Sequence, residues 1–156
     1  MSQGKLSLQQ QYAANSICFG CGPANRKGLQ IKSLVDSDRL IATFTPKDEH
    51  QAFPGVLCGG IVGTLMDCHC NWMASFAIMQ GQQLSEPPST VTADYQIKLK
   101  RPTPTDQAIQ LEAWVISCRG NRAHTGGHII ANGKITATCE GHFVAVNKSH
   151  PAYHRW

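Results

Sequence analysis

The chain has 156 residues, a length that fits one domain and buries roughly two-thirds of the unfolded surface. The formal net charge is +4 and the basic residues are scattered, which argues against the clustered basic stripe of a nucleic-acid-binding protein. No apolar run approaches the ~20 residues of a membrane span, and residues 1–16 lack the basic and apolar regions of a signal peptide. We therefore expect a cytoplasmic protein whose seven cysteines are reduced.

The N-terminal third contains two candidate strands. Residues 1–16 are expected to form an N-terminal arm or a short helix. Residues 29–35 and 39–46 suit strands, and the Asp-Ser-Asp sequence at 36–38 suits the turn between them.

One long helix is predicted from Gly59 to about Met79, ending near Gly81. Its residues form two stripes at steps of three and four. The apolar stripe, suited to a core, consists of Ile61, Leu65, Cys68, Trp72, Phe76 and Met79. The second stripe is small and polar, and consists of Gly60, Gly63 or Thr64, Asp67, Cys70 or Asn71, and Ala74. This second stripe is open to close backbone contact or to a ligand.

The C-terminal half alternates like antiparallel strands. In residues 91–100 one predicted face carries Val91, Ala93, Tyr95, Ile97 and Leu99, and the other carries Thr92, Asp94, Gln96, Lys98 and Lys100. Further strands are expected at about 108–118, 123–131 and 134–147, with Asn132-Gly133 as a type I′ hairpin signal. A helix followed by such strands predicts an α+β fold, in which a curved antiparallel sheet wraps one central helix.

The stretch GGIVGTLMD follows a proline-glycine turn and precedes a long helix and a strand that ends in LKRP. This arrangement resembles the hotdog-fold thioesterases, above all the phenylacetate-pathway and 4-hydroxybenzoyl-CoA thioesterase-like branch. The segment CFGCGPANRKGLQI also resembles the opening of many of these proteins. The resemblance covers about Cys18 to Val146. It implies one hotdog domain over residues 1–156 with five to six strands, an acyl-CoA substrate, no cofactor beyond coenzyme A, and a homodimer or homotetramer with sites between subunits.

The family pattern of a histidine, two glycines and a later acid maps onto Cys58, Gly59, Gly60 and Asp67. The resemblance implies that Asp67 is the general base or nucleophile, and that backbone N–H groups at Gly59 and Gly60 polarise the thioester carbonyl. A helix N-terminus favours a developing oxyanion because free N–H groups and the positive end of the dipole gather there. Asp67 lies about two turns further on the stripe of Gly60. We therefore expect both groups along one channel.

Cys58 departs from the family pattern, since relatives usually carry histidine at this position. Its thiol is either reactive, as thiols at helix N-termini are, or a small group that fills the space of the histidine. The missing histidine keeps open a second function, a non-catalytic acyl-CoA or lipid-binding protein. A hotdog dehydratase is a weaker alternative, because its pattern of histidine and acid is not found.

Further residues are candidates for substrate binding. Relatives carry an amide side chain where Ala52 stands, so the adjacent Gln51 is a candidate, as is His50 at the mouth of the channel. Thr64 and Asn71 lie on the polar stripe, and Asn71 is expected to line the acyl pocket or to bind the carboxylate. The basic candidates for the phosphates of coenzyme A are Lys98, Lys100, Arg101, Arg119 and Arg122. The bulky side chains that either fill the core or line an acyl tunnel are Trp72, Met73, Phe76 and Met79.

Two groups of cysteines are candidate metal ligands: the pair Cys18 and Cys21, and the sequence at residues 68–70. Cys18 and Cys21 have zinc-ligand spacing, yet they supply two of four ligands and no second pair of suitable spacing follows. A retroviral-type knuckle needs histidine where Arg26 stands. Residues 68–70 read Cys-His-Cys, but successive helix positions turn by ~100° and point apart. We therefore predict no metal, and a tight turn with packed thiols at Cys18 and Cys21.

Overall fold

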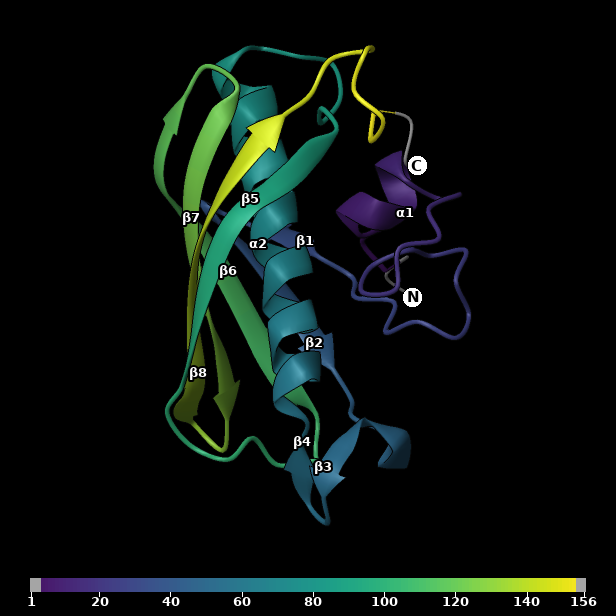
Figure 1. Ribbon diagram of the computed structural model, residues 1–156, viewed down its shortest axis with the longest axis vertical. Coiled ribbons are helices and arrows are strands. Elements are labelled where there is room, and N and C mark those ends of the chain that lie inside the picture. The colour runs from purple at the N-terminus through teal and green to yellow at the C-terminus, as the bar shows by residue number, and fades with distance from the viewer. Residues whose placement is uncertain (1–3, 154–156) are drawn as a thin grey trace.

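A curved antiparallel sheet wraps one long helix in the computed structural model, which describes residues 4–153 (Figure 1). In chain order the elements are α1 (Leu8–Tyr12), β1 (Leu34–Asp36), β2 (Arg39–Phe44), η1 (Asp48–His50), β3 (Gln51–Phe53), β4 (Val56–Leu57), α2 (Gly59–Gly81), β5 (Thr90–Leu99), β6 (Ile109–Arg119), β7 (Arg122–Ala131) and β8 (Lys134–Ala145). The six-stranded sheet has the order β1-β2-β6-β7-β8-β5, and β3 and β4 form a separate hairpin. The predicted α+β architecture is confirmed.

The helix α2 has 23 residues and ends at Gly81, as the sequence predicts. Neither helix in the part of the chain that the structure describes has the length and hydropathy needed to cross a membrane. The short helix α1 and the strands β2 and β5 to β8 also agree with the predicted elements to within a few residues. Of the predicted N-terminal arm, residues 1–3 lie outside the described residues.

The predicted strand over residues 29–35 is wrong for most of its length, because β1 begins only at Leu34. The backbone of the preceding residues is used elsewhere: the N–H of Leu29 donates to the Phe19 carbonyl (2.8 Å) and that of Ile31 to the Gly20 carbonyl (3.1 Å). The loop around Cys18 and Cys21 therefore takes the hydrogen bonds that a longer β1 would have used.

The buried face of α2 is rotated from the predicted apolar stripe. Ile61, Cys68, Phe76 and Met79 are only half-buried, whereas Gly63, Cys70 and Ala74 of the predicted polar stripe are buried. The reason lies in β7, where a Cβ at Gly127 would stand 2.5 Å from Met66 Cε and 3.0 Å from Cys70 Sγ. A glycine backbone packs directly on the small side of the helix, so that side faces the sheet. Of the predicted polar stripe, Gly60 is exposed and Thr64, Asp67 and Asn71 are half-buried.

A β-bulge at Ala93 changes which side chains of β5 face the helix. In the pairing with β8, Thr92 lies opposite Phe143 and Asp94 opposite His142, so Ala93 is the extra residue. The predicted alternation is therefore wrong across residues 91–94. Thr92 faces α2, on the same side of the strand as Tyr95, which approaches Gly63.

Turn chemistry agrees with the sequence at the Asn132-Gly133 and Pro54-Gly55 turns. Asn132 (φ 51°) and Gly133 (φ 70°) both adopt positive φ between β7 and β8, as a type I′ turn requires. Gly55 (φ 84°) closes the β3–β4 hairpin after Pro54. The sequence indicated this turn, but not the short strands on either side of it.

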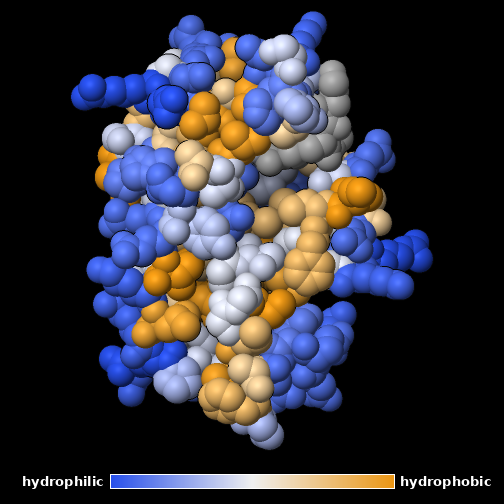
Figure 2. Space-filling view, in the orientation of Figure 1, coloured by the Kyte–Doolittle hydropathy of each residue, from blue (hydrophilic) through white to orange (hydrophobic). Residues whose placement is uncertain are grey.

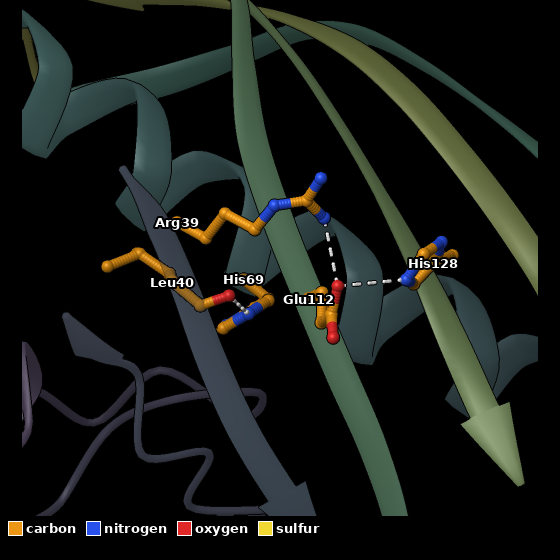
Figure 3. A network of polar contacts seen from close by, with 5 residues as sticks. All are labelled: Arg39, Leu40, His69, Glu112 and His128. Carbon is orange, nitrogen blue, oxygen red and sulfur yellow. Dashed lines mark hydrogen bonds and ion pairs between the residues drawn. The ribbon is translucent and has the colours of Figure 1, made fainter. Parts of the chain in front are cut away.

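A buried polar chain joins the N-terminal segment, α2 and β2. His69 is fully buried, and its Nδ1 lies 2.8 Å from Ser33 Oγ. Its Nε2 lies 3.1 Å from the Leu40 carbonyl oxygen (Figure 3). A carbonyl only accepts, so Nε2 carries the proton and Nδ1 accepts from Ser33. Gln9 in turn donates from Nε2 to Ser33 Oγ (3.0 Å). Burial lowers the pKa of His69 to about 4, which keeps the ring neutral.

Figure 3 also shows Glu112, whose carboxylate lies 2.9 Å from Arg39 Nη1 and 3.2 Å from His128 Nε2.

Replacing His69 with leucine should lower the free energy of unfolding by about 2–4 kcal/mol, because the buried Leu40 carbonyl and Ser33 hydroxyl lose their partner. Urea unfolding monitored by circular dichroism measures this. The control is His142→Ala, whose exposed side chain should change stability by no more than about 0.5 kcal/mol. Equal effects of the two substitutions would contradict a stabilising role for the buried chain.

Candidate functional site

A cavity of about 310 Å3 opens beside the middle of α2, against β5 and the N-terminal loop. It is lined by Ser16, Ile17, Cys18, Cys21, Asp67, Cys68, Asn71, Trp72 and Thr92. The face of the molecule drawn in Figure 2 is hollowed between the N-terminal segment and the rest of the chain, with apolar residues on both sides. A larger hollow of about 520 Å3 lies between the 84–89 loop and Tyr153, but no predicted site residue lines it.

Two threonines of β5 hold the polar side chains of α2 in this cavity. Thr92 Oγ1 donates to Asp67 Oδ1 (2.7 Å), and Thr90 Oγ1 donates to Asn71 Oδ1, one helical turn further along. Asp67 is thereby fixed in orientation while it remains half-buried. Asn71 lines the same cavity as Asp67, and its expected contact with the acyl group or the carboxylate stays a prediction. The sequence did not indicate the two threonines.

The start of α2 is a second polar feature. Cys58 is the N-cap residue, its side chain makes no capping hydrogen bond, and its N–H donates to the His50 carbonyl (2.9 Å). Gly59 and Gly60 are exposed, and within residues 4–153 no group accepts from either N–H. These N–H groups belong to the turn that has no intrahelical partner. A hollow of about 350 Å3 reaches Gly59, with the basic side chains of Lys100 and Arg101 in its lining.

Within one chain, the helix start and Asp67 line two separate hollows, and the expected single channel stays a prediction. Gly60 and Asp67 are seven residues apart, which corresponds to roughly 10 Å along the helix axis. The hollow at Gly59 and the cavity at Asp67 have no lining residue in common.

Three further candidates lie outside the cavity of Asp67. Gln51 is used in the β3–β4 turn, where its Oε1 accepts from the N–H of Gly55 (2.7 Å). His50 packs on Phe44, with ring centroids 5.5 Å apart. Thr64 donates to the carbonyl of Gly60 (3.0 Å) within the helix. None of these three side chains lines the cavity of Asp67.

The two arginines of the β6–β7 hairpin also lie elsewhere. Arg119 and Arg122 are paired in register and line an open hollow of about 460 Å3 with His124 and His142. His124 and His142 stack with ring centroids 4.3 Å apart, and His142 Nδ1 lies 2.8 Å from Asp94 Oδ1. This hollow shares no lining residue with the cavity of Asp67.

Three thiols meet at the wall of the Asp67 cavity. The Sγ atoms of Cys18, Cys21 and Cys68 all lie within 4.8 Å of one another, and those of Cys18 and Cys68 are 3.8 Å apart. Contacts with the thiols of Cys21 and Cys68 lower the pKa of Cys18 to about 2, and the contact with Cys18 raises the pKa of Cys21 to about 11. The pKa of Cys68 is also raised, chiefly by Cys18. The predicted packing of Cys18 and Cys21 thus includes a third thiol that the sequence did not indicate.

Comparison with known proteins gives matches among solved structures. No protein-family model matches the chain, and no curated protein matches it either. A thioesterase superfamily protein from Shewanella loihica is 28% identical, with a TM-score of 0.64 over 80% of this chain and 98% of that one. A thioesterase from Haemophilus influenzae has a TM-score of 0.71 at 16% identity, over 96% of both chains. The protein of the E. coli phenylacetic acid degradation operon has a TM-score of 0.65 at 17% identity, over 80% of this chain and 85% of that one.

The chain has the hotdog fold and is similar to a protein of the thioesterase superfamily. This confirms the resemblance that the sequence indicated around GGIVGTLMD. The one long helix and the six-stranded sheet are the hotdog architecture that was expected.

In this hotdog domain the N-terminal loop packs tightly on α2 at Gly20. A Cβ built there would lie 2.3 Å from Cys68 Sγ and 3.0 Å from Thr64 Cγ2. We predict that Gly20→Ala lowers the free energy of unfolding by about 1–3 kcal/mol, since overpacking forces the loop or the helix to shift. Gly81→Ala is the matched control, because a Cβ at Gly81 meets nothing within 4 Å. Urea midpoints that fall equally for both variants would show that the contact at Gly20 is loose.

Proposed function

We propose that this protein hydrolyses an acyl-CoA thioester, with Asp67 as the general base or nucleophile. The observation that carries the proposal is the half-buried carboxylate of Asp67, held by Thr92 in a cavity at the middle of α2. Similarity to solved proteins that are named as thioesterases supports thioester hydrolysis as the reaction class.

The chemistry needs a base and a site for negative charge. In the proposed reaction Asp67 accepts a proton from water as the water oxygen attacks the thioester carbonyl, and the C–S bond then breaks to release the thiolate of coenzyme A. In the variant mechanism the carboxylate attacks directly, and water hydrolyses the resulting anhydride. The uncapped N–H groups of Gly59 and Gly60 would stabilise the oxyanion of either intermediate.

The separation of Asp67 from its own helix start supports a site shared between two subunits. In an antiparallel pair of α2 helices centred near Thr64, Asp67 of one protomer lies level with the partner's Gly60, because each is about three or four residues from the centre. The strand β5 is at the edge of the sheet and leaves Tyr95 and Leu99 43% and 62% exposed. A long edge strand with exposed apolar side chains favours pairing with a second copy. We therefore propose a homodimer, or a tetramer built from it.

The phosphates of coenzyme A require basic side chains near the helix start. Lys100 and Arg101 line the hollow that reaches Gly59, which makes them the better-placed candidates within one chain. Arg119 and Arg122 remain candidates for a phosphate contact across the proposed dimer, since their own hollow is separate from Asp67.

Asp67→Asn should lower kcat/KM for the best acyl-CoA at least ~100-fold, because the amide keeps the size of the side chain but cannot accept a proton or attack. Cys58→Ala should cost less than about 10-fold, since the glycine N–H groups, not the thiol, polarise the carbonyl. Steady-state kinetics on a series of short, long and aromatic acyl-CoAs measures both, with circular dichroism as the check on folding.

Two outcomes would overturn the proposal. An inactive Cys58→Ala with an active Asp67→Asn would make the thiol the nucleophile. A folded wild-type protein that binds acyl-CoA and hydrolyses none of the series would favour the non-catalytic binding protein.

The dimer has its own test at the β5 edge. Leu99→Asp should shift the protein toward monomer in light scattering at micromolar concentration, because the exposed leucine would be buried in the pair. Ile116→Asp is the control, since Ile116 is 46% exposed on β6, away from that edge. A wild-type protein that is monomeric under these conditions would exclude the shared site.

A further inference from the structure

The strongest unassigned feature is the group of three thiols formed by Cys18, Cys21 and Cys68, which the proposed hydrolysis does not use. Two come from the N-terminal loop and the third from α2, next to Asp67 in sequence. We propose that these three thiols, as thiolates, bind one Zn²⁺ ion.

The spacing of the sulfur atoms suits a tetrahedral metal. Two thiolates at about 2.3 Å from a tetrahedral zinc ion lie about 3.8 Å from each other. The Sγ atoms of Cys18 and Cys68 are 3.8 Å apart, and all three sulfurs lie within 4.8 Å of one another. The same group of atoms fits a disulfide less well, because an S–S bond is only about 2.05 Å long.

Hydrogen bonds to the sulfurs favour the thiolate form that a metal requires. The indole Nε1–H of Trp72 donates to Cys21 Sγ (3.3 Å). Donors of this kind around the first coordination sphere orient the ligands and offset part of their negative charge.

The loop is also built as a tight turn. The N–H of Gly22 donates to the Cys18 carbonyl (2.8 Å). A Cβ at Gly22 would lie 2.4 Å from both the Cys18 nitrogen and the Ser16 carbonyl oxygen, so the turn accepts only glycine there. Glycine at positions 20 and 22 thus lets the Cys-X-X-Cys turn close on itself and on Cys68.

The fourth ligand position of the proposed ion faces the Asp67 cavity, since all three cysteines line it. A site with three protein ligands keeps one position for water or another small ligand. Zinc binding would release the protons of the thiols to solvent, so the affinity should rise with pH. No change in oxidation state is involved.

The test measures zinc binding by the full-length protein, purified without chelators and kept reduced. Competition with a chromophoric chelator should show about one tightly bound Zn²⁺ per chain. Cobalt(II) in place of zinc should give sulfur-to-metal charge-transfer absorption together with the visible bands of a tetrahedral ion. Cys18→Ser should weaken zinc binding at least ~100-fold, since even loss of a hydrogen bond to a ligand costs about 10- to 100-fold.

Cys18 is exposed, so its serine variant should fold, and circular dichroism checks this. Cys68→Ser should weaken binding similarly, whereas Cys118→Ser, a half-buried thiol on β6, should bind zinc as the wild type does. The proposal is overturned if the reduced wild type does not compete with the chelator, or if Cys18→Ser leaves the affinity unchanged. A Cys18–Cys68 or Cys18–Cys21 disulfide in freshly purified protein that binds no zinc after reduction would assign the thiols to redox chemistry instead.

Discussion

The structure depends on a single helix that has to complete the core and also carry the candidate site. The sheet covers the side of α2 that contains Met66 and Cys70, where Gly127 lets the backbone of β7 approach closely. The stripe through Gly60, Thr64, Asp67 and Asn71 is left partly open. A carboxylate on a helix that is otherwise so buried is tolerated because it lies on this open stripe and accepts a hydrogen bond from Thr92.

The N-terminal segment closes part of the open side, and buried polar contacts fix its position. Gln9 and Ser33 connect to His69, which reaches the carbonyl of Leu40 on β2. One helical position away, Cys68 meets the thiols of the N-terminal loop. Adjacent residues of α2 therefore serve three purposes: Asp67 faces the cavity, Cys68 contacts the loop that lines it, and His69 holds the segment to the core.

Local patterns predicted most of the fold. The period of α2, the turn at Asn132-Gly133 and the strands of the C-terminal half follow from neighbouring residues, and the motif around Asp67 indicated the superfamily. The parts that were missed arise from contacts between distant segments. Thr92 faces Asp67 because Ala93 is an extra residue opposite β8, and strict alternation contains no sign of a bulge. Cys68 joins Cys18 and Cys21 only because the loop packs on the helix.

The distance between the candidate residues along α2 favours a site shared between two subunits over a site within one chain. Asp67 is fixed in its own chain by Thr92, and the N–H groups of Gly59 and Gly60 are exposed at the helix start. Roughly 10 Å of helix separates them, and no rotation of side chains can shorten a distance set by the backbone. In the proposed dimer, a second copy of α2 running in the opposite direction would bring the two groups together without a change in either chain. The cavity, the uncapped helix start and the exposed β5 edge would then be parts of one proposed assembly of two chains.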